Sequence, residues 1–507
     1  MTTPATPSTP PDAAHIQGNL VGFNKDHQRL VFLRFVDAAS AKAFLAELEP
    51  QLARADDVLA FNAALKTVAD HGARPGTVES SWTNIVFTFA GLELLGAPGL
   101  DAFPSEFTAG MRAQAAQLGD TDDSDPSHWL APFDNAQNPI HAMVILAADD
   151  PDDLNTIYTD VQALMQQHGV TEAAPPQDGN TRPPPNAGHE HFGFKDGISQ
   201  PGIDGLTTSS KGDQIAAGQF LIGYPDRDGH ISGTAPTPPA TPQPGQPGYP
   251  PPTPTPTPTP VSSLPPWAKD GAFVVYRRLQ QNVGGFLNFL TTTAPQHNLN
   301  PDQLGAKLVG RWKSGAPLEH TPDEAATLDP SAQDPSTADP SLLTDAKINN
   351  FDYVPDDADG HLVPRAAHIR KTNPRGEDPP GQPESNRRRI LRRGIPYGPD
   401  FVPDETPYPP SGPPPAAQDR GLLFICYQAS IANGFAFIQE SWVNTPTFPS
   451  SDDGGDGRDP IISQDVAQPD FRLGQGVHLT TQRWVITTGG EYLFSPSIEA
   501  IRQFVAH

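Results

Sequence analysis

Both halves of this 507-residue chain show the same order of buried strands and amphipathic helices. In the first half, residues 29–36 (RLVFLRFV) and 82–89 (WTNIVFTF) are apolar enough for buried strands, and a helix with an apolar stripe is predicted over 39–52 between them. A third strand is predicted over 140–146, followed by a long helix over 153–167. This order is typical of an α+β domain in which helices pack on an antiparallel sheet.

The second half repeats this order. A strand over 271–279 (GAFVVYRRL) leads into a helix that runs through residue 289, and a strand over 421–427 (GLLFICY) precedes a helix over 431–442. No clear sequence repeat links the two halves, so the prediction of two similar domains rests on the pattern alone.

A proline-rich segment separates the halves. Residues 231–266 contain no charged residue and include the run PTPTPTPTP, which favours an extended, polyproline-type insertion over a packed core. The resulting domain prediction is a disordered tail over 1–15, an N-terminal domain over 16–230, the insertion over 231–266 and a C-terminal domain over 267–507.

The charge balance and the single cysteine exclude several classes of protein. A formal net charge of −26 argues against nucleic acid or an anionic membrane as a partner of the general surface. Cys426 is the only cysteine, which excludes an intramolecular disulfide and a cysteine-based zinc site. The N-terminus shows no secretory signal and the chain has no apolar run long enough to span a bilayer, so a cytoplasmic location is expected.

The stretch Gly188–Gly202 (GHEHFGFKDGISQPG) concentrates ionisable side chains among glycines and aromatic residues. Asp196 lies between Lys195 and Gly197, where the backbone leaves room for a ligand. A solvated surface loop is the simpler interpretation of this stretch taken alone. Neither a G-x-S-x-G nor a Walker-type motif occurs, and the spacing of the nearby histidines is not H-E-x-x-H.

Two further stretches carry candidate chemistry. His368 lies in AAHIRKTNPR, and five arginines lie within 387–393 of NRRRILRRGIPYG. Such an arginine cluster is either a solvated face or an anion site, since guanidinium groups bind carboxylates in bidentate geometry. Imidazole is a common haem ligand, and haem propionates would use arginine. A peroxidase also needs a group that moves a proton, which aspartate or histidine can be, and a fixed positive charge, which arginine can supply.

Taken together, these motifs resemble the dye-decolourising (DyP-type) haem peroxidase family, in its larger fungal and actinobacterial branch. The resemblance covers most of the chain outside the proline-rich insertion and is carried by residues 16–27, 103–111, 193–203, 368–375, 390–398 and 421–431. It implies an α+β fold of two ferredoxin-like domains, each an antiparallel β-sheet with packed helices. It also implies one haem b per chain, held mainly by the C-terminal half.

The resemblance assigns a role to individual residues. Asp196 is implied as the distal acid/base, Arg392 as the distal charge stabiliser and His368 as the proximal iron ligand. Arg387, Arg388, Arg389 and Arg393 are neighbouring alternatives to Arg392.

Four further residues are implied around the haem. Leu422 and Phe424, two apart on one strand, match an apolar pair in the distal pocket. His189 matches a histidine near a propionate and the access channel. Asp459 is a candidate for the carboxylate that hydrogen-bonds the proximal histidine, with Asp452, Asp453 and Asp456 nearby.

The function implied is a haem peroxidase that reduces hydrogen peroxide and oxidises dyes, phenols and other bulky aromatic donors in one-electron steps. The protein is expected to be a monomer or homodimer. A haem-binding or haem-handling protein with little peroxidase turnover is the alternative. Electron transfer to bulky donors would use a tyrosine or tryptophan, for which the candidates are Trp442, Trp312, Trp267, Tyr397 and Tyr427.

Overall fold

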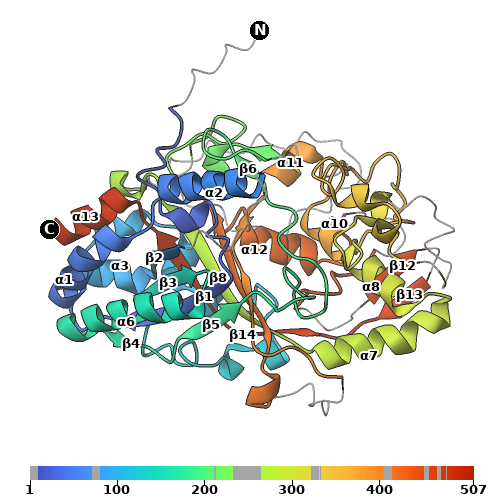
Figure 1. Cartoon of the computed structure of the whole chain (residues 1–507), viewed down its shortest axis with the longest axis horizontal. Helices are drawn as coiled ribbons and strands as arrows, with labels where there is room; N and C mark the ends of the chain where they lie inside the picture. The colour runs from blue at the N-terminus through green and yellow to red at the C-terminus, as the bar shows by residue number, and fades with distance from the viewer. Residues whose placement is uncertain are drawn as a thin grey trace, which may run out of the picture.

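The structure is a computed structural model, drawn in Figure 1. It describes residues 9–70, 80–209, 213–231, 264–320, 331, 333–377, 380–403, 414–449, 456–464, 470–474 and 477–506. The predicted proline-rich insertion lies outside the described residues from 232 to 263.

The N-terminal half contains the predicted strand-helix order. It runs β1 (His27–Arg34), α1 (Ala38–Leu48), β2 (Ser81–Phe87), β3 (Ala142–Ala148), α6 (Pro151–His168) and β4 (Thr171–Glu172). The strands lie in the order β2-β3-β1-β4 and pair antiparallel, which is the ferredoxin-like arrangement. An aspartate caps the first turn of both α1 and α6: Asp37 accepts a hydrogen bond from the backbone of Ser40, and Asp150 from that of Asp152.

The C-terminal half has the same order. It runs β8 (Ala272–Gln281), α7 (Val283–Thr293), α8 (Pro301–Val309), β10 (Ile395–Tyr397), β11 (Gly421–Gln428), β14 (Val485–Ser495) and α13 (Ile498–Ala506). Its strands lie in the order β10-β11-β8-β14, with the two-residue β9 (Leu391–Arg392) also paired to β11. The predicted α+β fold of two ferredoxin-like units is therefore confirmed.

The two units share one sheet. β14 pairs with β2 at Phe494 and Phe87, which joins both sets of strands into a ten-stranded antiparallel sheet. Phe494 also contacts the rings of Phe103, Phe107 and Phe273, so aromatic packing from both halves covers this junction. Figure 1 shows the blue and cyan N-terminal helices on one side of the sheet and the orange and yellow C-terminal elements around the other end.

Further elements complete the described chain. They are α2 (Ala55–Asp70), α3 (Phe89–Leu95), α4 (Ser105–Ala109), α5 (Met111–Gln114), β5 (Gln177–Asn180), β6 (Gly202–Ile203), β7 (Gln214–Ile215), α10 (His368–Thr372), α11 (Gln382–Asn386), α12 (Phe435–Phe437), β12 (Asp470–Gly474) and β13 (Val477–Thr480), with several short 3₁₀ turns. The helix predicted over 431–442 is instead α12 followed by a π-helical turn over Ile438–Val443. Among the described residues, no helix is both long and apolar enough to cross a membrane.

Candidate active site

A single cavity brings together most of the residues that the sequence singled out. It lies between the Gly188–Gly202 loop, α10, β11 and the π-helical turn. Five of the predicted site residues line it: Asp196, Arg392, His368, Leu422 and Phe424. Asp459 lies behind His368, and His189 is not among the described residues that line the cavity.

Asp196 and Arg392 form an ion pair in this cavity. The guanidinium Nη1 of Arg392 lies 2.7 Å from Asp196 Oδ1, which also accepts the backbone N–H of Gly197 at 2.6 Å. Burial alone would raise the pKa of the Asp196 carboxyl, but Arg392 and the Gly197 N–H together lower it below its usual value. Asp196 is therefore held as a carboxylate that is ready to accept a proton.

The backbone of Arg392 is fixed on both of its edges. β9 pairs with β11 so that Arg392 lies opposite Cys426. On the other edge, the side-chain amide of Gln200 donates to the Arg392 carbonyl at 3.0 Å and accepts its N–H at 3.2 Å. Gln200 lies four residues after Asp196, so this double contact fixes the Gly188–Gly202 loop against β9.

The neighbouring arginines have other partners. Arg393 donates to the carbonyls of Asn19 and Leu20, and Arg389 forms a bidentate pair with Asp213. Arg387 and Arg388 both pair with Glu384. Arg392 is thus the member of the cluster whose guanidinium forms the ion pair with Asp196.

His368 begins α10 and is oriented by a buried carboxylate. Its Nδ1 lies 2.8 Å from Asp459 Oδ2, and the Asp459 side chain has no exposed surface. An Nδ1–H that donates to this carboxylate leaves Nε2 with its lone pair, as a metal ligand requires. The alternative Asp456 lies 3.9 Å from Arg365, and Asp452 and Asp453 fall outside the described residues.

Part of the cavity wall is apolar. Leu422 and Phe424 project from β11, as their spacing predicts, and Phe192, Ile438 and Ile461 also line the cavity. Phe424 packs against Phe435 with ring centroids 6.1 Å apart. Such walls suit the faces of a flat aromatic macrocycle.

Two arginines in the cavity wall provide a test of whether a haem fits. Arg311 and Arg375 are almost fully buried, and neither forms an ion pair with a carboxylate of the described residues. Arg311 donates to the carbonyls of Gly315 and Ile348 and to Asn349 Oδ1. Arg375 donates to the carbonyl and Oδ1 of Asn349 and to the Ser199 hydroxyl. Burial and the proximity of Arg375 lower the pKa of Arg311 to about 9.

Two buried positive charges without an anion are costly, and a ligand with two carboxylates would neutralise them. Asn373, also in the wall, has both side-chain polar atoms buried and without a hydrogen-bond partner among the described residues. Together with His368 and the apolar walls, this donor set fits a haem and its two propionates. These three residues were not predicted from the sequence, although Asn373 and Arg375 lie in the motif around His368.

The remaining ionisable residues of the Gly188–Gly202 loop brace it. Glu190 accepts the backbone N–H groups of Phe192 and Phe194 at 2.8 Å and the Gln281 amide at 2.6 Å. His191 is buried, and its Nε2 donates to the Tyr397 carbonyl at 2.8 Å. His189 donates from Nδ1 to the carbonyl of Ala187 at 3.0 Å, so its proposed place beside a propionate stays a prediction.

Comparison with family models identifies both halves of the chain. Residues 15–183 match a model described as the DyP dimeric alpha+beta barrel domain, and residues 257–450 match the Dyp-type peroxidase C-terminal domain.

Relatives with solved structures or assigned names match over nearly the whole chain. Peroxidase 2 of Mycetinis scorodonius is 34% identical, over 96% of this chain and 86% of its own length. The multifunctional dye peroxidase DyP2 of an Amycolatopsis species is 29% identical, over 94% of this chain and 92% of its own length. A much shorter match, to a deferrochelatase of Yersinia pestis, is 36% identical over 17% of this chain and 15% of that protein.

Solved structures also match this chain over nearly its whole length. An ancestral D-type dye-decolorizing peroxidase aligns with a TM-score of 0.79 at 33% identity, covering 98% of this chain and all of the other. A dye-decolorizing peroxidase in complex with 2,6-dimethoxyphenol aligns with a TM-score of 0.76 at 31% identity, covering 98% and 99% of the two chains.

Proposed function

The chain belongs to the dye-decolourising (DyP-type) peroxidase family and is a peroxidase, and we propose that Asp196, Arg392 and His368 are the residues with which it reduces hydrogen peroxide. One observation carries this proposal: the Asp196–Arg392 pair and the carboxylate-bound His368 line the same cavity.

The proposed cofactor is one haem b per chain, with His368 as the iron ligand. When bound, the haem supplies the iron that takes up peroxide and holds the two oxidising equivalents released when the O–O bond breaks. Arg311 and Arg375 would neutralise the propionates, and Leu422 and Phe424 would cover one face of the porphyrin. Asp459 would hold His368 in one tautomer and raise its basicity.

Asp196 would move the proton. As a carboxylate, it would accept a proton from one oxygen of hydrogen peroxide and return it to the other oxygen, which would leave as water. The Arg392 guanidinium stabilises the negative charge that develops on the leaving oxygen. Two one-electron oxidations of a donor, with uptake of two protons, return the enzyme to its starting state and release the second water.

Phenols, dyes and other bulky aromatic compounds are the proposed donors. The dimethoxyphenol complex of a structural relative supports a phenolic donor for this chain too. Among the aromatic candidates, Trp442 is the best supported relay for electrons. It stacks on the partly exposed ring of Phe448 at 5.0 Å and 7°, and it packs in one cluster with the cavity-lining Ile438.

The test is rapid mixing of the haem-loaded protein with hydrogen peroxide. Arg392→Leu should slow the peroxide reaction by roughly 10²–10³, the effect of removing one charge-stabilising donor. Arg387→Leu, at a more exposed arginine of the same cluster, is the matched control and should react normally. An unchanged rate in Arg392→Leu would assign the charge-stabilising role to another residue.

The ligand assignment needs a separate measurement. His368→Ala should abolish stable haem binding, and retention of a full Soret band would refute the assignment. The haem-handling alternative predicts a wild-type protein that binds haem but reacts slowly with peroxide.

A further inference from the structure

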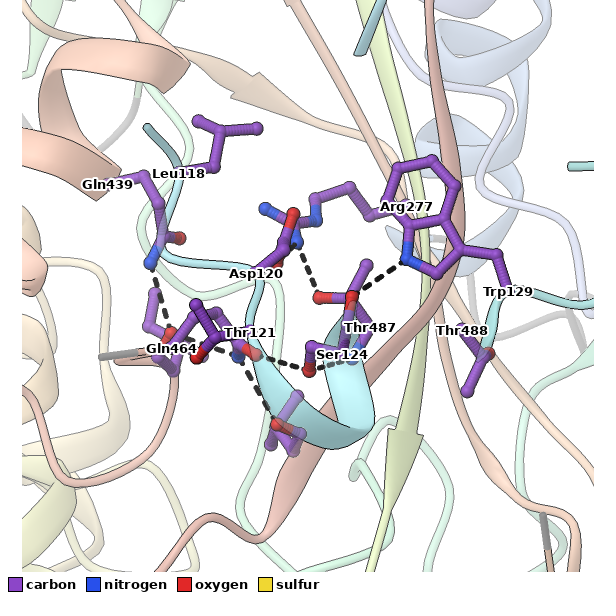
Figure 2. Close-up of polar contacts among 12 residues, drawn as sticks. Leu118, Asp120, Thr121, Ser124, Trp129, Arg277, Gln439, Gln464, Thr487 and Thr488 are labelled. Carbon is purple, nitrogen blue, oxygen red and sulfur yellow. Dashed lines mark hydrogen bonds and ion pairs between the residues drawn. The ribbon is translucent and has the colours of Figure 1, made fainter. Parts of the chain in front are cut away.

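A segment of the N-terminal half lies behind the proposed proximal ligand. Residues 118–124, called here the 118–124 segment, end in the fully buried Ser124. Its hydroxyl donates to Gln464 Oε1 at 2.7 Å and accepts the backbone N–H of Thr487 at 3.0 Å. Figure 2 shows these contacts, together with the bond from the Trp129 indole N–H to the Ser124 carbonyl. Ser124 is thus held between β14 and Gln464.

Gln464 connects Ser124 to the turn that carries Asp459. Its amide Nε2 donates to the carbonyl of Ile462 at 3.4 Å and to that of Val485 at 3.2 Å. The backbone N–H of Ile462 donates in turn to Asp459 Oδ1 at 3.0 Å. The other oxygen, Oδ2, faces His368 Nδ1. Hydrogen bonds therefore connect Ser124 to His368 through Gln464, the backbone of Ile462 and the Asp459 carboxylate.

Asn444 holds the same turn from both sides. Its Oδ1 accepts the N–H of Gln464 at 3.1 Å and the hydroxyl of Ser463 at 3.2 Å. Its carbonyl accepts Nε of Arg458, the residue before Asp459, at 2.9 Å. Its Nδ2 donates to the carbonyl of Leu118 at 2.9 Å, which is a second contact with the 118–124 segment.

We propose that Ser124 and Gln464 are positioning residues through which the N-terminal half fixes the Asp459 carboxylate against His368. The strength of a histidine–carboxylate hydrogen bond depends on its geometry. The geometry of Asp459 is set by a turn that Gln464 and Asn444 connect to the 118–124 segment. The inference rests on the proposed roles of His368 and Asp459. It adds that the proximal side of the cavity is built by both halves of the chain.

The experiment compares variants of the haem-loaded, full-length protein by midpoint reduction potential and by the rate of haem transfer to a scavenging apoprotein. Asp459→Asn should raise the potential and weaken haem retention by roughly 10–100-fold, as loss of such a partner does at metal sites. Ser124→Ala should shift both quantities in the same direction by less. Ser127→Ala, at an exposed serine whose hydroxyl donates to Asp125, is the matched control and should change neither.

A double variant separates positioning from a general structural role. If Ser124 acts through Asp459, then Ser124→Ala should add no further shift of potential in the Asp459→Asn background. If Ser124→Ala does not fold, Gln464→Leu serves instead, since it removes the acceptor for Ser124 and the amide donor to Ile462 without placing a charge in this buried site, and the same upward shift is expected.

The outcomes distinguish a failure of the positioning inference from a failure of the proposed role of Asp459. A potential and haem retention at wild-type values in Ser124→Ala and Gln464→Leu, with a clear shift in Asp459→Asn, would overturn the positioning inference alone. No shift in Asp459→Asn would overturn the proposed role of Asp459 and the inference with it. Additive shifts in the double variant would also overturn the inference, because Ser124 would then act by another route.

Discussion

Replacing His191 with glutamine should make the protein more resistant to acid. The His191 ring is only 3% exposed, and its Nε2 donates to the Tyr397 carbonyl. Its Nδ1 is buried without a hydrogen-bond partner among the described residues. Protonation would place an N–H without an acceptor, and a positive charge, in this buried site. Burial accordingly lowers the pKa of His191 to about 4, despite the hydrogen bond to Tyr397.

The sign and size of the effect follow from this pKa. Above about pH 6.5, the ordinary value, His191 is neutral in both the folded and the unfolded chain. As the pH falls from about 6.5 to about 4, the unfolded chain binds a proton that the folded chain does not, so stability is lost across this window. At roughly 1.4 kcal/mol per pKa unit, the loss reaches about 3 kcal/mol.

The assay is urea unfolding of the haem-loaded protein at several values of pH between 7 and 4. Glutamine keeps an amide N–H for the Tyr397 carbonyl but does not titrate. The free-energy difference between His191→Gln and the wild type should therefore grow in favour of the variant by about 3 kcal/mol from pH 7 to pH 4. Ion-paired carboxylates titrate in both proteins, so they cancel in this difference. Two parallel stability curves would refute the reasoning.

Three further predictions concern charges in and near the cavity. Arg375→Leu should weaken haem retention by more than it lowers the urea stability of the haem-free protein, because it removes a buried charge that has no carboxylate partner among the described residues as well as hydrogen bonds to Asn349; a parallel loss of both would indicate a structural arginine. Asp120→Ala should lower the free energy of unfolding by about 3–5 kcal/mol, because it leaves the buried Arg277 guanidinium without its carboxylate, and a loss below about 1 kcal/mol in the same assay would contradict this. The rate of the peroxide reaction should hold steady down to about pH 4, because Arg392 offsets the effect of burial and keeps the pKa of Asp196 low. In Arg392→Leu the rate should begin to fall at a higher pH, and an acid limb at the same pH in both proteins would show that Arg392 does not set this pKa.

Local sequence patterns were sufficient to predict the strands and helices that carry strong periodicity. The runs at β1, β2, β3 and β8 are apolar and short, so they identified buried strands within a few residues of the observed bounds. The pairing of Phe494 with Phe87 could not be predicted, because it joins residues 407 positions apart (494 minus 87) through a single register pair. The π-helical turn over 438–443 also escaped prediction, since its apolar spacing is compatible with an α-helix.

The residues of the site also differ in whether the sequence predicts them. Motif order predicted Asp196, Arg392 and His368, and the structure places all three in one cavity. Arg311 carried no such signal, because in the sequence VGRWKSG it has the composition of a solvated turn. Its burial is decided by packing of α8 and the residues around Asn349, which no local pattern encodes.

Both sides of the cavity depend on contacts that cross between the halves of the chain. On the distal side, the Gly188–Gly202 loop supplies Asp196, and Gln200 of the same loop holds the backbone of Arg392. On the proximal side, the 118–124 segment holds the turn that orients Asp459. Because β14 and β2 join the two sheets, these contacts span parts of one continuous framework rather than a flexible junction between domains. Preorganised catalytic groups must be held by rigid neighbours. The shared sheet therefore fixes the positions of the groups on the two sides of the cavity relative to one another.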